Sequence, residues 1–531
     1  MKTMSRVLSL IIVLVLSFSV VLSGCNQTAS NPSTSGTSKQ DGTTTQSTAA
    51  TTENLTAEHV KLKIYFLGDE PQDAGLVFTE INKKMTEKIN AELEAAFLSW
   101  GDWDKRYPLL FSSGEDFDMI YTADWAFYSQ TASKGGLYEL SQDMLKTYCP
   151  LTVENHPQEV WSSTQINGKN YMIPNNNFFA NHYGVIIRGD LREKYGLSEV
   201  KTIEDIEAFM DAVLANEKGM IPLDVSKDNA EMLARAFVFY PSERYYLAGG
   251  SGTAGTLTYD FSDPKVFDLK PFYEVPGYVD FLKRMVTWNK KGYISKSDLT
   301  TANSKRFEAG KSAVTIDNLG MADGYWQKAK VDHPDWKIEY VNLLEGKKLC
   351  AQGYVGNGLG FNAKTKNIER ALMAVDLMEY DPDINFLVTN GIPGVHNDID
   401  GKFTLDGREF IKMKPVDPAK YGGFSTWCFI NEPVFPVESF PFFNELIVSY
   451  YYNQKVIHPL SGFTFVTDAV NTEIANTTPI MQEYLPILYL GFNDDAEIML
   501  DEFVTKIKAA GVDKVNEEMT AQAQKLFDAA P

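Results

Sequence analysis

The sequence is poor in cysteine and in basic residues, and these two shortages exclude several classes of protein. Four cysteines in 531 residues are too few for a disulfide-stabilised scaffold. Lys and Arg number 49 against 70 Asp and Glu, which gives a net charge of −21. Nucleic-acid binding and attachment to an anionic membrane surface both need clustered basic residues, so neither is expected. The 44% of hydrophobic residues is typical of a packed globular protein, long enough for two or three domains.

Motifs of common catalytic and cofactor sites are also missing. The sequence has no Walker-type phosphate loop and no helical pair of histidines for zinc. Segment 356–360 lacks the spacing of a dinucleotide fingerprint, and segment 249–253 departs from a nucleophile elbow at its last position. A calcium-loop spacing begins at Asp381, but Phe386 occupies the glycine position, so a helix stop is favoured. We expect no cofactor and no metal, while paired carboxylates for glycoside hydrolysis stay open.

The first 25 residues have the composition of an export signal. A short basic region precedes an apolar stretch from Val7 to Leu22. This stretch is too short, and too often interrupted by serine, to predict a membrane-spanning helix. It ends in Leu-Ser-Gly-Cys, which resembles a bacterial lipobox. The resemblance implies a lipoprotein signal peptide, residues 1–24, and a lipid such as palmitate on Cys25. An ordinary secretory signal and an uncleaved anchor are the alternatives.

A polar segment follows the signal. Residues 26–58 are dominated by Ser, Thr, Gln, Asn and Gly and have too few apolar side chains to fold. We expect residues 25–58 to form a lipidated, disordered tether with a reach of roughly 30 Å. It would hold the body at the outer face of a cell membrane, where a solute arrives from outside. The later cysteines, Cys149, Cys350 and Cys428, are expected to be buried thiols.

From residue 59 onward, strand and helix patterns alternate. Strands are predicted at 59–67, 91–99 and 117–121, with helices at 74–89 and 103–111 between them. This order predicts an α/β fold with mostly parallel sheets flanked by helices, whose ligands bind at the carboxyl ends of the strands. Further predictions are helices at 203–215, 279–291 and 369–380, a small hairpin around 402–405, and two C-terminal helices within 496–530 that are separated at Gly511.

Several segments, taken in their order along the chain, resemble the extracellular solute-binding proteins (family 1) of bacterial ABC importers. These segments are Phe111–Tyr121, Gly135–Leu140, Asn167–Pro174, Ile187–Leu197 and Phe307–Val314. Segments 391–396 and 462–465 are similar to LipO-like lipoproteins with the C-terminal region found in Firmicutes, although the first has Gly-Ile-Pro-Gly in place of Gly-Ile-Glu-Gly. The resemblance covers nearly all of residues 60–531.

The resemblance implies a two-lobed periplasmic-binding-protein-like fold of type II, with the ligand in a cleft between the lobes. Lobe one would comprise residues 59–178 and 356–455, and lobe two residues 179–355 and 456–531. The chain would cross near 174–180, near 354–362 and again near Gly462. Closure by a hinge would present a monomeric protein to ABC permease subunits.

Sugars are held by aromatic faces and by carboxylates and amides that bond hydroxyl groups. The pair Asp124-Trp125 is the strongest candidate, because it follows the third strand. Helix capping is the alternative for Asp69 and Glu70, and core packing is the alternative for the tryptophans. Trp100, Trp103, Trp161, Trp288 and Trp336 are expected to be structural. The full set of candidate ligand-binding residues is Asp69, Glu70, Asp124, Trp125, Asn177, Asp317, Asn318, Trp326, Asn357 and Trp427.

These features together predict a lipid-anchored binding protein that delivers a small solute, with an oligosaccharide as the first candidate, to an ABC importer. Two alternatives have the same predicted location at the membrane surface: a tethered carbohydrate hydrolase, and a lipoprotein that senses a ligand for a membrane receptor. Peptide, polyamine and metal-chelate binders share the architecture, so the ligand class stays open at this point.

Overall fold

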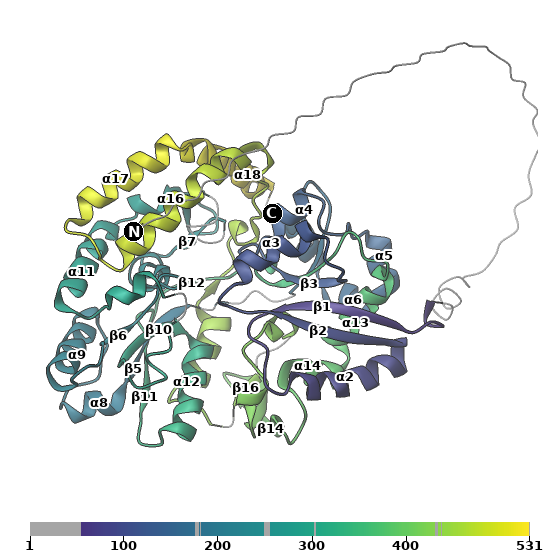
Figure 1. Ribbon diagram of the computed structural model, residues 1–531, viewed down its shortest axis with the longest axis horizontal. Helices are drawn as coiled ribbons and strands as arrows, with labels where there is room; N and C mark the ends of the chain where they lie inside the picture. The colour runs from purple at the N-terminus through teal and green to yellow at the C-terminus, as the bar shows by residue number, and fades with distance from the viewer. Residues whose placement is uncertain are drawn as a thin grey trace, which may run out of the picture. The chain divides into compact units, whose positions relative to one another are not determined.

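The computed structural model describes residues 55–529 apart from 176–179, 181, 249–254, 302–303, 431–433 and 437. The predicted signal peptide, Cys25, nearly all of the predicted tether and the candidate Asn177 lie outside the described residues. Figure 1 shows the arrangement of the helices and strands.

The first sheet has five strands in the order β2-β1-β3-β13-β4. The strand β1 pairs in parallel with β2 and β3, whereas β13 is antiparallel to β3 and β4. Helix α2 (Ala74–Ile89) packs against it through buried side chains at helical spacing, such as Val77, Ile81 and Met85. The strands are β1 Val60–Leu67, β2 Ala91–Leu98, β3 Met119–Thr122, β4 Met172–Pro174 and β13 Gly358–Phe361; further helices of this lobe are α3 Trp103–Ser113, α4 Tyr128–Ser133, α5 Gln142–Tyr148, α6 Pro150–Asn155, α7 Gln158–Ser163, α13 Ile368–Tyr380 and α14 Pro382–Asn390.

The second sheet has four strands in the order β11-β5-β10-β6. Its central strand β5 is antiparallel to β10 and β11, and β10 is parallel to β6. The strands are β5 Tyr183–Arg188, β6 Leu223–Asp224, β10 Val314–Asn318 and β11 Ile338–Val341; the helices around it are α8 Gly189–Lys194, α9 Ile203–Asn216, α10 Glu231–Ala234, α11 Tyr278–Lys291, α12 Leu319–Asp332, α15 Phe443–Val448, α16 Asn471–Tyr489, α17 Ala496–Ala509 and α18 Val512–Ala529.

Each sheet has its own hydrophobic core, which gives the two lobes. The first core draws its buried residues from 62–173 and 359–429, and the second from 180–349 and 440–512. The predicted two-lobed α/β fold is therefore confirmed. The expectation of mostly parallel sheets is wrong, because the strands next to the crossings run against their neighbours. The four strand pairs above that include β13 or β5 are antiparallel, and the pairs of β1 with β2 and β3 and of β10 with β6 are parallel.

Three segments connect the two cores. The first follows β4 and leads to β5, and the second joins β12 (Leu349–Cys350) to β13, both close to the predicted positions. The third lies between Phe429 of the first core and Phe440 of the second, well before the predicted crossing near Gly462. Phe440, Phe443 and Tyr450 consequently pack in the second core, although they were predicted to belong to lobe one. The other lobe limits stay a prediction.

Smaller elements complete the described part of the chain. The predicted hairpin consists of β14 (Asn397–Leu405) and β15 (Arg408–Pro415), which turn at Asp406 and Gly407 with positive φ angles of 52° and 75°. A π-helix, η1 (Arg235–Phe239), continues directly from α10. The remaining strands are β7 Arg244–Tyr246, β8 Leu257–Asp260, β9 Leu269–Pro271, β16 Val434–Pro436 and β17 Lys455–Val456.

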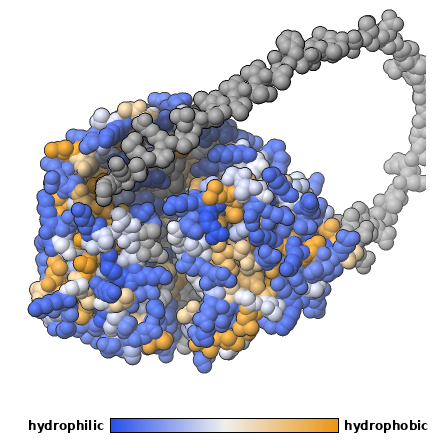
Figure 2. All heavy atoms as spheres, in the orientation of Figure 1, coloured by the Kyte–Doolittle hydropathy of each residue, from blue (hydrophilic) through white to orange (hydrophobic). Residues whose placement is uncertain are grey.

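The surface of the body is largely hydrophilic with scattered apolar patches, as Figure 2 shows. Within the ranges that the structure describes, no helix has both the length and the apolar character needed to cross a membrane. Cys149, Cys350 and Cys428 are buried and form no disulfide, as the sequence predicted. Asp381 ends α13 and caps α14, since its carboxylate accepts a hydrogen bond from the Ile384 N–H at 3.1 Å, as expected of a helix stop.

Candidate ligand-binding site

An aromatic platform, which we call the indole face, lies on the first lobe and consists of Trp100, Trp125, Trp427 and Tyr121. Trp100 follows β2 and stacks on Trp427, with ring centroids 5.9 Å apart and planes inclined by 18°. Tyr121, at the end of β3, lies 5.7 Å from Trp125 and 6.1 Å from Trp427. All three tryptophans are half-buried, so part of each ring is open to solvent. Such partly open rings are suited to packing against the C–H surface of a sugar.

The indole N–H groups of this face are bonded within the protein. Trp125 donates to the backbone carbonyl of Gly356 at 2.9 Å, and Trp100 donates to that of Gly423 at 3.2 Å. These bonds fix the ring orientations and leave the apolar ring surfaces as the accessible part. Trp103, expected to be structural, adds an edge-on contact to Trp125 at 5.6 Å.

Asn357, in the second crossing segment, holds two of these rings. Its side-chain oxygen accepts hydrogen bonds from the Tyr121 hydroxyl at 2.7 Å and from the Trp427 indole at 2.8 Å. Its backbone carbonyl accepts from the N–H of Asn175 in the first crossing, at 2.9 Å. The predicted candidate Asn357 thus connects two crossings to the indole face, and its amide oxygen is used within the protein.

Asp124 follows β3 directly and lies beside the indole face. Its carboxylate accepts a hydrogen bond from the Trp125 N–H at 2.8 Å. Burial raises the pKa of Asp124 to about 6, although its side chain is still partly accessible. A carboxylate that is both desolvated and accessible is typical of the wall of a recess. The positive charge of Arg235 in the second lobe acts in the opposite direction on this pKa.

Arg235 begins the π-helix of the second lobe and is paired there. Its Nε and one terminal nitrogen lie 2.8 and 2.7 Å from Glu231, one turn earlier. The guanidinium lies over the rings of Tyr246 and Tyr245, at 4.9 and 5.6 Å from their centroids. Burial lowers the pKa of Arg235, but the charge of Glu231 and the neighbouring tyrosines together outweigh burial and raise the pKa overall. Irregular π-turns of this kind are frequent at functional sites.

Three tyrosines form a stacked row beside Arg235; we call Tyr183, Tyr240, Tyr245 and Arg235 together the tyrosine face. Adjacent rings are 6.1 Å apart and inclined by only 9° and 7°. The Tyr245 hydroxyl accepts a hydrogen bond from Gln352 at 3.3 Å, and the charge of Asp124 contributes to the raised pKa of Tyr245. This face therefore combines the half-buried Tyr183 and Tyr245 with a paired cation.

Asp317 and Asn318 lie at the carboxyl end of β10. Burial raises the pKa of Asp317 to about 6, and the Tyr325 hydroxyl donates to its carboxylate at 3.3 Å. Asp317 is half-buried and also contributes to the raised pKa of Tyr183, which connects it to the tyrosine face. Asn318 caps α12 instead, because its side-chain oxygen accepts the Met321 N–H at 3.0 Å.

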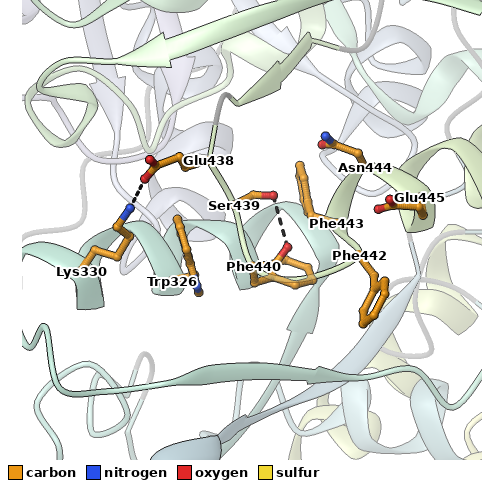
Figure 3. A pocket seen from close by; sticks show the side chains of 9 residues that line it. All are labelled: Trp326, Lys330, Glu438, Ser439, Phe440, Phe442, Phe443, Asn444 and Glu445. Atoms are coloured by element: carbon orange, nitrogen blue, oxygen red, sulfur yellow. Dashed lines mark hydrogen bonds and ion pairs between the residues drawn. The ribbon is translucent and has the colours of Figure 1, made fainter. Parts of the chain in front are cut away.

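Trp326 lies farther along α12, in a separate recess of about 350 Å³. Figure 3 shows Trp326 and Lys330 on α12 opposite the segment 438–445, with Lys330 paired to Glu438. The Lys330 ammonium lies 4.6 Å from the centroid of the Trp326 ring. None of the described residues that line this recess belongs to the indole face. The structure thus places Trp326 apart from Trp125 and Trp427.

Asp69 and Glu70 are exposed at the end of β1. Asp69 accepts the Trp100 N–H at 3.3 Å and so borders the indole face. Neither residue caps α2, whose N-cap position is Asp73, so the capping alternative is wrong. Within the described ranges, no group of three or more His, Cys, Asp or Glu side chains is placed to hold a metal ion.

Sequence reasoning missed Trp100 and the whole tyrosine face. Trp100 directly follows a predicted strand, and the same position after a strand was the reason for choosing Trp125 as a candidate. Tyr240 and Tyr245 lie in an aromatic-rich run, residues 237–246, which offered a weaker signal. The contact of Tyr183 with this run depends on the packing of β5 against η1 and carried no local signal.

Comparison with known proteins adds a sequence relative. A "Carbohydrate ABC transporter substrate-binding protein" of Streptococcus pneumoniae serotype 4 is 25% identical over 477 residues, which cover 87% of this chain and 90% of the relative. A family model for a domain of unknown function, DUF3502, matches residues 459–527.

Solved structures share the fold. The N-glycan transport solute binding protein NgtS from Streptococcus pneumoniae, in complex with Man5GlcNAc, has a TM-score of 0.69 at 21% identity and covers 89% of this chain and 100% of its own. The alginate-binding protein AlgQ2 has a TM-score of 0.62 at 17% identity, with 88% and 99% covered. The sequence match and the shared fold confirm the resemblance of this chain to the extracellular solute-binding proteins of ABC importers.

Proposed function

We propose that this protein captures an oligosaccharide between its two lobes and delivers it to the permease subunits of an ABC importer. The observation that carries the proposal is the presence of an aromatic face on each lobe, the indole face and the tyrosine face, each with a half-buried and desolvated carboxylate, Asp124 and Asp317. Ring faces pack on sugar C–H groups, and carboxylates accept from sugar hydroxyls. The relatives with a carbohydrate-transport name and with a bound N-glycan support this ligand class.

A hinge motion about the three crossing segments would close the lobes on the ligand. Charges that act across the lobes support this motion. Burial raises the pKa of Asp228 in the second lobe, and the charges of Asp104 and Lys105 on α3 of the first lobe also act on it. A monomer closed in this way would present both lobes to the permease.

Binding without turnover is tested with the purified full chain. We expect a neutral oligosaccharide at 100 times its dissociation constant to stabilise the protein by about 2.7 kcal/mol, visible as a thermal shift. Mass spectrometry of the recovered sugar then separates a binding protein, which returns it intact, from a hydrolase, which returns fragments. Absence of a shift with every oligosaccharide, in a preparation with a cooperative melting transition, contradicts the proposal.

The lipid anchor is a second part of the proposal and has its own test. The lipobox-like ending at Cys25 and the polar segment after it support attachment to the outer face of the cell membrane. Growth with an alkyne-labelled fatty acid should label the wild-type protein. The variant Cys25→Ala should lose the label and appear in the medium, whereas Cys149→Ala should keep it. Equal labelling of both variants contradicts a lipid on Cys25.

A further inference from the structure

We infer that the ligand is uncharged where it meets the two lobes, and that the site selects against sugars with carboxylate or sulfate groups. This inference rests on the proposed function and adds a chemical class to it. It follows from how the charged side chains of the two faces are paired.

Arg235 is the cation of the tyrosine face, and its hydrogen-bonding edge is occupied. Recognition of a carboxylate by arginine uses two parallel N–H donors. In Arg235, Nε and one terminal nitrogen lie at 2.8 and 2.7 Å from Glu231, and another terminal nitrogen is 3.5 Å from the Tyr240 hydroxyl. An acidic sugar would have to displace Glu231, which would leave that carboxylate without its cation.

The other cations near the faces are neutral, paired or exposed. Burial lowers the pKa of His182, which packs on Tyr240, to about 3, so its ring carries no charge near neutral pH. Lys227 lies 3.5 Å from Asp228. Lys105 is exposed on α3 and also acts on Asp228.

The undescribed internal segments add no cation to this inventory. By sequence, residues 176–179, 181, 249–254, 302–303, 431–433 and 437 contain no Lys, Arg or His.

Negative charge, in contrast, is available on both sides. Asp124 and Asp317 each retain accessible carboxylate surface, and carboxylates accept hydrogen bonds but donate none. Sugar hydroxyls can donate to them, whereas a sugar carboxylate would face like charge in a desolvated place. The net charge of −21 also disfavours the approach of an anion.

The fold alone does not decide this point. The alginate-binding protein AlgQ2 shares the fold with a TM-score of 0.62, and alginate is a polymer of acidic sugars. Selection for or against charge must therefore come from side chains such as Arg235 and its partner Glu231.

The test uses the full chain and isothermal titration calorimetry with two panels of equal size. The neutral panel contains Man5GlcNAc, maltose and chitin oligosaccharides, and the acidic panel contains alginate, oligogalacturonate and sialylated oligosaccharides. The tightest neutral ligand is then oxidised at its primary hydroxyl groups to carboxylates, which gives a matched acidic probe. We expect the oxidised probe to bind roughly a hundredfold more weakly than its parent.

Two variants make the cause visible. In Glu231→Gln, the positive charge of Arg235 loses its carboxylate partner. The ratio of the affinities for the parent sugar and the oxidised probe, which we call the affinity gap, should then decrease about tenfold. Asp124→Asn should narrow it by removing a repelling charge. Glu339→Gln, which breaks a pair with Arg192 at 2.6 Å on the outer side of the second lobe, should leave the gap unchanged.

The outcomes separate this inference from the proposed function. An acidic oligosaccharide, or the oxidised probe, that binds within tenfold of the tightest neutral ligand overturns the inference while the proposed function stands. An unchanged gap in both Glu231→Gln and Asp124→Asn also overturns it. Binding of neither panel by a folded protein overturns the proposed function, and the inference with it.

Discussion

The two faces of the candidate site use their polar atoms differently. On the indole face, the N–H groups of Trp100, Trp125 and Trp427 all donate to protein oxygens, so mainly ring surface is left for a ligand. On the tyrosine face, Tyr183 and Tyr245 keep accessible surface next to a charged pair. One face is an apolar platform with fixed rings, and the other is polar.

This difference suggests a division of roles. Ring surfaces that are already held in place lose little conformational freedom on binding, so the indole face should supply most of the affinity. Hydroxyl and charged groups discriminate between ligands because a mismatched partner leaves them unpaired. The tyrosine face should therefore determine which sugar is accepted. The predictions below test this division.

The largest effect is expected from Trp427→Ala. The change removes a ring that stacks on Trp100 at 5.9 Å and contacts Tyr121. Loss of one aromatic anchor costs about 2–3 kcal/mol of binding free energy, or roughly 30- to 150-fold in affinity. Calorimetry with the sugar found in the screen measures it, and Tyr245→Ala should cost clearly less.

Trp336→Ala is the matched control for this experiment. Trp336 is also half-buried but stacks on His333, with ring centroids 3.9 Å apart, away from both faces. Its replacement should leave affinity within twofold of the wild type. A larger loss in Tyr245→Ala than in Trp427→Ala would reverse the proposed division of roles.

Asn357→Leu should produce the next largest effect, on stability as well as on binding. The change leaves the Tyr121 hydroxyl and the Trp427 N–H without the acceptor they share at 2.7 and 2.8 Å. Two donors left unpaired should lower the free energy of unfolding by about 2 kcal/mol. Urea unfolding followed by tryptophan fluorescence measures the loss. Asn216→Leu, at an exposed helix end, is the control and should change stability by less than about 0.5 kcal/mol.

Local patterns were sufficient to predict much of the fold. Helix α2 was predicted with its observed bounds, Ala74–Ile89, because apolar residues recur at helical spacing and a strand pattern follows at once. The direction of strands such as β13 was not predictable, because pairing across a crossing depends on contacts between distant segments. The third crossing was misplaced for the same reason: Phe440 looks no different in sequence from a first-core residue.

The residues of the candidate site likewise fall into those that local sequence patterns predict and those that depend on packing between distant segments. Asp124 and Trp125 were predicted as candidates because they follow a strand at the edge where such sheets bind ligands. Arg235 was missed because its role depends on a π-helix and on ring contacts with Tyr245 from the next sheet. Sequence shows which residues end a strand, whereas a site built from side chains of several elements is defined only by their packing.

Binding should weaken below pH 6, with an effect of about tenfold between pH 7 and pH 5. Burial raises the pKa values of Asp124 and Asp317 to about 6, so both carboxylates are mostly charged at pH 7 and mostly protonated at pH 5. A protonated carboxyl is a poorer acceptor for sugar hydroxyls. Calorimetry across this range measures it, and the double variant Asp124→Asn with Asp317→Asn should show a flat profile.

The stability of the ligand-free protein should follow the opposite trend from these two groups. Their folded pKa values lie above the ordinary value of 3.8, so the folded protein binds protons more readily than the unfolded chain between pH 4 and pH 6. Their contribution to stability therefore increases as the pH falls through 6. Comparison of wild type with the double variant isolates it, and a binding profile that merely follows global stability would contradict the role of the carboxylates.

The smallest effect is expected from Tyr325→Phe, which tests the polar side of the comparison most finely. The Tyr325 hydroxyl donates to Asp317 at 3.3 Å and helps to hold down the pKa of that carboxylate. Without it, the pKa of Asp317 should rise further, so the pH midpoint of binding should move upward by less than about one unit. At pH 7 this leaves affinity within about threefold of the wild type. Tyr195→Phe, whose hydroxyl also bonds a carboxylate, that of Glu217 at 2.6 Å, should leave the midpoint unchanged. A shift in Tyr325→Phe alone would show that the tyrosine side acts on the ligand through Asp317, whereas equal shifts in both variants would assign the effect to the fold as a whole.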